Sequence, residues 1–265
     1  MKSDSFLIYG TDKKMMSCCQ RLKSFGFEAD MINNENTNCI GEYGNIILPL
    51  PTIANSKING TDKTLFEFIA ALNSQQKVFC GNIDARKYNN FYSYYNAAFL
   101  IKNSRLTAQG VLRMISINIE VDFKDLSVAV IGYGRCGKAI CKLLKNCSMN
   151  ITSFSRRNES IVLARNDGMI ADDLFNLNHN ISDFDIIINT VPVNIIDREC
   201  LAKLSQRNIY IEIASKPYGF NVSESDVFNF KYILAESLPG RFTPVSAGYN
   251  IADTVLDIIK EGDNG

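Results

Sequence analysis

The sequence contains few of the side chains from which metal sites are built. Its 265 residues include a single histidine, His179, and eight cysteines that form no Cys-x-x-Cys pair. A zinc site needs four convergent ligands, and only Cys200 lies near His179 in sequence, so we expect no bound metal. The thiols are expected to be reduced and partly buried.

The chain also lacks an excess of charge and a long apolar run. Its 28 basic residues balance 28 acidic residues, whereas proteins that bind nucleic acids or membrane surfaces usually carry a basic excess. No apolar segment approaches the roughly 20 residues that cross a bilayer, and the polar start MKSDSFLIYG does not fit a signal peptide. We therefore expect a cytoplasmic protein whose partners include neither nucleic acid nor membrane.

Short apolar segments alternate with helical patterns along the whole chain. In the first part they predict strands at 5–10, 27–32, 45–51 and 77–82, with helices after residue 10 and at 62–72. In the later part they predict strands at 127–132, 150–157, 184–192, 208–215 and 231–240. Such alternation is typical of doubly wound parallel sheets with helices on both faces, so we expect an α/β protein with two Rossmann-like domains.

Two further helical patterns set the expected domain boundaries. On the segment 105–119 the apolar side chains share one face and Thr107 is placed to cap the helix start, which predicts a helix that connects the domains. A last helix at 246–262 is expected to close the first domain. The predicted domains are a substrate domain, 1–118 with 245–265, and a dinucleotide-binding domain, 119–244. The substrate is expected in a cleft between them.

The segment GYGRCG at residues 132–137 is the clearest binding motif. It follows the apolar strand SVAVI and opens a helix, which is the setting in which a Gly-x-Gly-x-x-Gly turn binds a dinucleotide. Its glycines would allow the tight turn, the approach of a pyrophosphate and close packing of helix on strand. We assign Gly132, Gly134, Arg135, Cys136 and Gly137 to cofactor binding. The alternative is a glycine-rich turn that binds nothing.

The end of the next strand indicates which dinucleotide is bound. NAD-binding proteins place an Asp or Glu there, about 20 residues past the glycines, on the ribose 2′-hydroxyl. This chain has Ser155, Arg156 and Arg157 instead, and no carboxylate before Glu159. Because two guanidinium groups suit a 2′-phosphate, we predict NADP. The alternative is that both arginines are solvated surface charges.

A polar segment ends the strand predicted at 184–192 in the same domain. It reads Asn189, Thr190, Val191 and Pro192. In open parallel sheets, ligands bind outside the carboxyl ends of the strands, so we expect this segment beside the nicotinamide ribose. The alternative is an ordinary turn at the end of a strand.

Several of these segments resemble the A subunit of dipicolinate synthase, a two-domain Rossmann-type protein of spore-forming bacteria. The likeness is carried, in order along the chain, by LPLP, TAQG, GYGRCG, INTVP, EIASKPYG and LAESLPGRFTPVSAG. The resemblance implies oxidation of a dihydrodipicolinate-type intermediate of the lysine pathway to pyridine-2,6-dicarboxylate during sporulation, with NADP as hydride acceptor. It also implies the mother-cell cytoplasm as location and a flavoprotein-like B subunit as partner. Assembly into a homo-oligomer stays open.

A flat diacid substrate needs donors for its two carboxylates. Arg241, after the last predicted strand, can form a bidentate pair, and Lys216 can supply a point charge. The amides of the helix that Thr107 is expected to cap could hold the other carboxylate. Gln109 stands where the family pattern has a glutamate, and an amide can hydrogen-bond but cannot take a proton as a carboxylate does. Alternatively, Lys216 and Arg241 are surface charges and Thr107 is only a cap.

Other dehydrogenase classes fit the sequence less well. A 2-hydroxyacid dehydrogenase would need a catalytic histidine after the later strands, and none follows His179. A shikimate-type dehydrogenase would need a Lys–Asp pair in the first domain, for which only Lys57 and Asp62 are loose candidates. A regulatory or redox-sensing protein that binds NADP(H) without turnover remains open.

Overall fold

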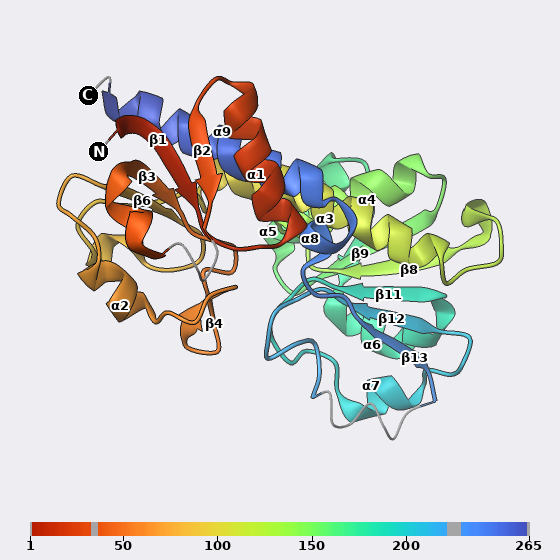
Figure 1. Ribbon diagram of the computed structural model, residues 1–265. Coiled ribbons are helices and arrows are strands. Elements are labelled where there is room, and N and C mark those ends of the chain that lie inside the picture. The colour runs from red at the N-terminus through yellow and green to blue at the C-terminus, as the bar shows by residue number, and fades with distance from the viewer. Residues whose placement is uncertain (1, 33–36, 222–228, 264–265) are drawn as a thin grey trace. The chain divides into compact units, whose positions relative to one another are not determined.

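The chain forms two compact α/β units. The computed structural model describes residues 2–32, 37–221 and 229–263. Unit 1 comprises the chain up to Asn103 and from Thr243 onward, and unit 2 comprises Ser104–Phe242. The sequence placed the first boundary at 118/119, whereas the units divide inside the long helix α3 (Ala97–Ser116). Both units are built on parallel sheets with flanking helices, which confirms the predicted fold class (Figure 1).

Unit 1 contains a five-stranded parallel sheet in the order β2-β1-β3-β6-β7. Its strands are β1 (Lys2–Ile8), β2 (Glu28–Met31), β3 (Tyr43–Ile47), β6 (Lys77–Cys80) and β7 (Phe91–Ser93). A small antiparallel ladder pairs β4 (Ile53–Ala54) with β5 (Lys57–Ile58). The helices wholly within the unit are α1 (Lys13–Ser24), α2 (Leu65–Ala70) and α9 (Pro244–Asp263). The strand order reverses between β1 and β3, so the carboxyl ends of these two strands form the switch point where such sheets bind ligands.

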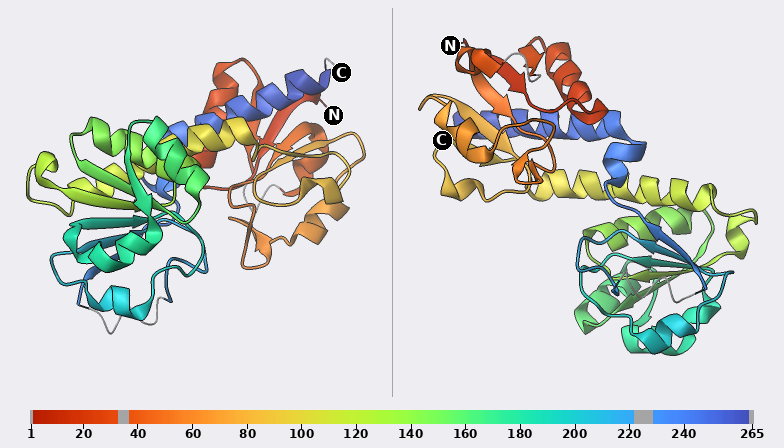
Figure 2. Two further views of the ribbon diagram at one scale, coloured as in Figure 1. Left: turned by 180° about the vertical axis from the view of Figure 1, so that it is seen from behind. Right: turned by 60° about the horizontal axis from the view of Figure 1, so that its bottom comes forward.

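Alternating side chains along β1 build two core layers in unit 1. Phe6 and Ile8 pack with α1 and α9 on one face of the sheet, while Leu7 packs with Phe68 of α2 on the other. Helices α1 and α9 lie side by side although they come from opposite ends of the sequence (Figures 1 and 2). Gly248 permits this approach, because a Cβ there would lie 2.1 Å from the carbonyl oxygen of Lys14. The C-terminal helix thus completes the core of the N-terminal unit.

Unit 2 contains a six-stranded parallel sheet in the order β10-β9-β8-β11-β12-β13. Its strands are β8 (Ser127–Ile131), β9 (Asn150–Ser155), β10 (Ile170–Asp173), β11 (Ile186–Asn189), β12 (Ile209–Glu212) and β13 (Lys231–Leu234). Its own helices are α4 (Arg135–Asn146), α5 (Asn158–Asn166), α6 (Leu174–Asn180), α7 (Arg198–Ala202) and α8 (Leu238–Phe242). Counted within the unit, the strand order is 3-2-1-4-5-6, which is the order of dinucleotide-binding Rossmann domains.

Helices cover both faces of the unit 2 sheet (Figure 2). Val128 and Val130 of β8 pack with α3 and α4, while Ala129 and Ile131 pack with α6 and α7. On the first face α3 also meets α8 closely, since a Cβ at Gly110 would lie 2.7 Å from Cβ of Leu238. The TAQG and LPG segments therefore touch each other. Short 3-10 helices complete the chain at Thr37–Glu42, Ala85–Lys87, Phe123–Asp125 and Ile181–Asp183.

Two predicted element boundaries are wrong. Helix α3 begins at Ala97, and its start is capped by Asn96, whose Oδ1 accepts a hydrogen bond from the Phe99 amide at 2.9 Å. Thr107 is therefore interior to the helix and does not cap it, so its neighbouring amides are committed to helical hydrogen bonds. The aromatic run YNNFYSYYNAAF, residues 88–99, had concealed this helix start.

The strand predicted at 231–240 is the second error. It ends at Leu234, and Leu238–Phe242 form the short helix α8, so Arg241 lies on a helix and not directly after a strand. Pro239 fits the first turn of a helix, because its missing N–H would have no helical partner there. Among the described helices, none combines the length and the apolar character that a bilayer span requires.

Candidate dinucleotide-binding site

The turn after β8 requires glycine at two of its positions. Gly132 has a φ of +93°, and a Cβ there would lie 2.6 Å from both Thr190 Oγ1 and Val191 Cγ2. A Cβ at Gly137 would lie 2.0 Å from the Gly132 carbonyl oxygen. The Gly132 amide donates to the carbonyl oxygen of Phe154 at 2.8 Å, which ties the turn to the end of β9. The glycine turn therefore packs closely against the start of α4, the end of β9 and the segment after β11.

Gly134 is glycine for a different reason. It is the N-cap of α4, it provides no side-chain cap, and nothing lies within 4 Å of the place where its Cβ would be. The first amides of a helix have no partner within the helix. The hydrogens of these amides and the helix dipole favour an anionic group at this point.

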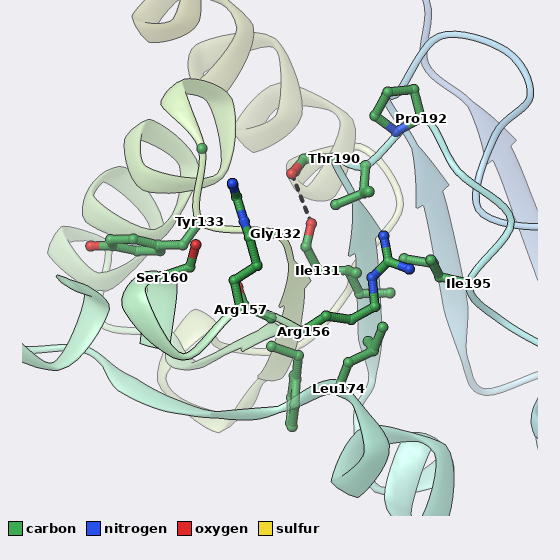
Figure 3. Close-up of a pocket in the computed structure, with 14 residues that line it drawn as sticks. Ile131, Gly132, Tyr133, Arg156, Arg157, Ser160, Leu174, Thr190, Pro192 and Ile195 are labelled. Carbon is green, nitrogen blue, oxygen red and sulfur yellow. Dashed lines mark hydrogen bonds between the residues drawn. The ribbon is translucent and has the colours of Figure 1, made fainter. Parts of the chain in front are cut away.

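A cavity of about 410 Å³ lies beside the glycine turn, at the carboxyl ends of β8, β9 and β11 (Figure 3). It is lined by Ile131, Gly132, Tyr133, Gly134, Phe154, Ser155, Arg156, Arg157, Ser160, Leu174, Thr190, Val191, Pro192 and Ile195. Among these described residues none is acidic. The volume is in the range of small-molecule and cofactor sites. The cavity therefore combines apolar walls with a positively charged side.

The positive side is formed by the residues that follow β9. Figure 3 shows Arg157 extending alongside Gly132, while Arg156 extends towards Ile195. Neither guanidinium group pairs with a carboxylate of the described residues. Ser155 is 7% exposed, and its buried Oγ has no hydrogen-bond partner. The residue as a whole belongs to the wall of the cavity.

The opposite wall follows β11. Thr190 Oγ1 donates to the Ile131 carbonyl oxygen at 2.7 Å, drawn as the dashed line in Figure 3. The Val191 amide donates to Asn189 Oδ1 at 3.0 Å. Asn189 itself is fully buried and lies outside the cavity lining. It therefore supports the wall from behind instead of contacting a ligand.

Asp167, at the end of α5, anchors the glycine turn from outside the cavity. Its carboxylate accepts a hydrogen bond from the Tyr133 hydroxyl at 3.0 Å and lies 2.8 Å from Lys138 Nζ and 3.5 Å from Lys142 Nζ. The hydrogen bond from Lys138 lowers the pKa of Asp167, and that from Tyr133 adds to it. Burial, together with the bond to Asp167, raises the pKa of Tyr133. An ionised carboxylate thus holds both the turn and the helix that follows it.

The cavity brings together most of the residues predicted to bind a cofactor. These are Gly132, Gly134, Ser155, Arg156, Arg157, Thr190, Val191 and Pro192. Gly137 serves the packing of the turn, and Arg135 and Cys136 lie in the first turn of α4 outside the lining. Sequence reasoning missed Ile131, Tyr133, Phe154, Ser160, Leu174 and Ile195. Most of these lie at or next to strand ends and turns, and that position in the sequence could have indicated them.

The residues predicted to hold a substrate do not line this cavity. Thr107 is buried on α3, whereas Gln109 of the same helix is exposed. Lys216 and Arg241 are exposed, and the Arg241 guanidinium lies 5.3 Å from the ring centroid of Phe242. Their assignment to the substrate stays a prediction.

The residues weighed for other dehydrogenase classes lie elsewhere. His179 is exposed on α6 and its ring packs edge-on against Phe175, with the centroids 4.7 Å apart. Lys57 and Asp62 approach each other to 3.5 Å in unit 1, with both side chains largely in solvent. Neither arrangement adds a titratable group to the cavity of unit 2.

The fold and the cavity are those of a domain that binds a nicotinamide dinucleotide, as found in oxidoreductases. Residues 103–218 match the family described as D-isomer specific 2-hydroxyacid dehydrogenase, NAD binding domain. The chain is also 26% identical, over 161 residues, to the A subunit of dipicolinate synthase from Bacillus subtilis (strain 168). That alignment covers 61% of this chain and 54% of the relative, so the match spans about half of the relative's length.

Solved structures with the same fold include two dipicolinate synthase A subunits. The dipicolinate synthase A chain from Bacillus subtilis has a TM-score of 0.81 at 19% identity, covering 98% of this chain and 97% of its own. The corresponding protein from Bacillus halodurans has a TM-score of 0.83 at 19% identity, covering 97% and 98%. The chain is thus similar to dipicolinate synthase A subunits both in sequence and in fold.

Proposed function

We propose that this chain acts as the A subunit of a dipicolinate synthase, an NADP-dependent oxidoreductase that converts a dihydrodipicolinate-type intermediate into pyridine-2,6-dicarboxylate. The observation that carries the proposal is the cavity beside the GYGRCG turn, with Arg156 and Arg157 on its positive side and no acidic residue in its described lining. Bound NADP would supply the hydride acceptor. The reaction, the coenzyme preference and the place of the enzyme in sporulation all belong to this proposal.

The preference for NADP over NAD rests on the end of β9. An acidic residue at this point would hydrogen-bond a ribose hydroxyl and repel a phosphate, and the described cavity lining has none. Arg156 and Arg157 can pair with a 2′-phosphate. Arg157 is also the N-cap of α5 and makes no side-chain cap, so the first amides of α5 are available for the same anion.

The remaining residues bind and orient. The amides at the start of α4 would hold the diphosphate, and the wall at Thr190, Val191 and Pro192 would exclude water from the other half of the coenzyme. Lys216 and Arg241 are proposed to hold the substrate carboxylates. Aromatisation also releases a proton, and Gln109 cannot take it, so Gln109 is proposed to donate or accept a hydrogen bond only.

The name of the Bacillus subtilis relative describes one subunit of an enzyme. We therefore extend the proposal to a partner chain, the flavoprotein-like B subunit that the resemblance implies, and to the cytoplasm of the mother cell as the place of action. Co-purification of the two chains, followed by assay of the separated and the mixed chains, tests this part.

The coenzyme assignment is tested by titrating the protein with NADP⁺ and NAD⁺. We expect R156A to weaken NADP⁺ binding by about tenfold or more, the scale of one lost charge-assisted hydrogen bond, while NAD⁺ binding changes little. R86A is the matched control, because Arg86 is an exposed arginine of unit 1 that pairs with Asp84. A preference for NAD⁺ that survives R156A would overturn the assignment.

The reaction is tested by mixing the protein with the dihydropyridine dicarboxylate precursor, NADP⁺ and a candidate B subunit. A synthase produces NADPH and the ultraviolet absorbance of the pyridine diacid in equal amounts. Tight coenzyme binding without turnover under all these conditions would favour the regulatory or redox-sensing alternative and contradict the proposed activity.

A further inference from the structure

We propose that Glu212 is a positioning residue for coenzyme binding: through Asn189 and the Gly219 amide it fixes both ends of the cavity wall formed by residues 190–195. The proposal rests on the proposed function for the identity of the ligand. The positioning itself is a property of the protein alone and can be measured without any ligand.

Glu212 is a fully buried carboxylate at the carboxyl end of β12. It lies in register with Asn189, the last residue of β11. Asn189 Nδ2 donates to its two oxygens at 2.9 and 3.0 Å. The amides of Ala214 and Gly219 donate to Oε1 and Oε2 at 2.9 and 2.8 Å. No lysine or arginine of the described residues pairs with it.

The contacts of Glu212 match an ionised carboxylate. All of them are N–H donors, and an ionised carboxylate is a pure acceptor, whereas a protonated one would need an acceptor of its own. Burial raises the pKa of Glu212, and the hydrogen bonds from Gly219, Asn189 and Ala214 oppose this rise. A buried carboxylate is tolerated only when such bonds satisfy it, so the surrounding loops must keep their geometry.

Two short routes connect this carboxylate to the cavity wall. On the first, Asn189 Oδ1 accepts from the Val191 amide and its Nδ2 lies 3.0 Å from the Val191 carbonyl oxygen. On the second, the Gly219 carbonyl oxygen accepts from the amides of Ile195 and Ile196 at 2.8 and 3.1 Å. Thr190, Val191, Pro192 and Ile195 between these points line the cavity. Both ends of the wall are therefore tied to one side chain.

The junction leaves no room for adjustment. A Cβ at Gly219 would lie 2.4 Å from the Tyr210 hydroxyl and 2.7 Å from Asn189 Nδ2. The loop that carries Gly219 thus rests directly on the side chains beneath it. Glu212 does not line the cavity, and its oxygens are occupied by donors, so it acts through its neighbours and not on a ligand.

E212Q is the sharpest variant because it keeps the shape of the side chain. Glutamine replaces one acceptor oxygen with a donor, so either the Ala214 or the Gly219 amide loses its partner and faces another N–H. D185N is the matched control. Asp185 accepts from the amide and the hydroxyl of Ser127, each at 2.8 Å, at the opposite end of the same sheet. Like E212Q, the D185N substitution replaces a carboxylate with an amide next to a backbone N–H donor.

The first readout is amide hydrogen exchange in the ligand-free protein. We expect E212Q to accelerate exchange at Val191, Ile195 and Ile196 by about tenfold or more, while D185N leaves these amides unchanged. The second readout is NADP⁺ affinity, which we expect to fall about tenfold in E212Q and to stay at the wild-type value in D185N, because binding must then reorder the wall. In turnover, the KM for NADP⁺ should rise more than kcat falls.

The outcomes separate this inference from the proposed function. Unchanged exchange at the three amides in folded E212Q overturns the positioning role, whatever the ligand. Accelerated exchange with no NADP⁺ binding by the wild type supports the positioning role and contradicts the proposed coenzyme. Should E212Q fail to fold, N189A removes the first route alone, and it should loosen Val191 while Ile195 and Ile196 remain protected. If the amides of Val191, Ile195 and Ile196 all exchange in N189A at their wild-type rates, the inference is also overturned.

Discussion

The two units have parallel sheets of related topology but differ at the turn after their first strand. In unit 1, Gly10 has a φ of +99°, and Asp12 caps α1 by accepting from the Met15 amide at 2.8 Å. In unit 2, Gly132 has a φ of +93°, and Gly134 caps α4 without any side-chain hydrogen bond. An amide at the start of α1 is thus satisfied by the carboxylate of its N-cap residue, whereas the start of α4 has no side-chain cap.

This difference shows what a doubly wound sheet provides and what it leaves to single residues. Topology supplies a switch point and a helix N-terminus in both units. In unit 1, Asp12 places a negative charge where an anionic ligand would lie, and Lys14 donates to the Leu50 carbonyl oxygen beside it. In unit 2 nothing fills the space above Gly134. The N-cap residue therefore decides whether the helix start can serve a ligand.

G134D is expected to have the largest effect, because it gives α4 the N-cap residue that α1 has. The backbone at Gly134 accepts any residue, with φ at −78° and no atom within 4 Å of a Cβ, so an aspartate should cap α4 as Asp12 caps α1. We expect NADP⁺ affinity to fall by at least about 100-fold, because the carboxylate takes the amides and repels the diphosphate. The melting temperature should stay equal or rise. Calorimetric titration and thermal unfolding measure both.

G134A is the control for G134D, because it adds a Cβ without a charge. It should keep most of the affinity. An aspartate variant that binds NADP⁺ as well as G134A does would contradict the role given to the open helix start.

G132A and G10A should separate ligand binding from backbone strain. Each forces an L-residue into positive φ, which costs about 1–2 kcal/mol of unfolding free energy. G132A should cost more, because its Cβ would clash with Thr190 and Val191 at 2.6 Å, while the nearest atom to a Cβ at Gly10 is Met15 Cγ at 3.1 Å. Only G132A should also lose NADP⁺ binding. Urea unfolding gives the stabilities, and an equal loss of affinity in both variants would refute the distinction.

D12A removes the side-chain cap of α1, so that this helix start becomes uncapped like that of α4. Loss of the cap should lower the unfolding free energy by about 1 kcal/mol. We expect the variant still to bind one NADP⁺, because Gly10 and Thr11 do not belong to the cavity that Arg156 and Arg157 line. A second equivalent bound by D12A in calorimetry would mean that the cap alone keeps ligands out of unit 1.

Asp167 should give the smallest effect, visible as a pH dependence. Its pKa is lowered in the folded protein by Lys138 and Tyr133, so its contribution to stability is present above the ordinary pKa of aspartate, about 3.9, and is lost as the pH falls through the lower folded value. The denaturant midpoint of the wild type should therefore fall more steeply in acid than that of D167N. Parallel profiles would contradict the anchoring of the turn by this carboxylate.

The sequence predicted best those parts of the fold that are apolar throughout. Strands β8 and β11 are buried on both faces and read as continuous apolar runs before a turn. β10 was missed because it contains Asp172 and ends in Asp173 at the edge of its sheet, and β7 was concealed in the aromatic run. Helix α3 starts inside that same run, so its cap was sought at Thr107 instead of Asn96.

The residues of the candidate site likewise fall into those that the sequence predicted and those that it did not. Motif spacing and strand ends predicted the glycine turn, the two arginines and the wall after β11. The role of Glu212 depends on burial and hydrogen bonding across strands, which spacing does not encode. A glutamate within the apolar run IYIEIAS was nevertheless a visible signal, since buried carboxylates require partners. The substrate residues were chosen by charge alone, and charge does not specify which cavity a side chain lines.

Coenzyme binding by unit 2 can be measured by calorimetric titration of the wild-type protein with NADP⁺ and, separately, with NAD⁺. The open start of α4 and the paired arginines after β9 predict one NADP⁺ bound per chain, with NAD⁺ weaker by about tenfold or more. Absence of heat and of thermal stabilisation with either coenzyme would contradict the account.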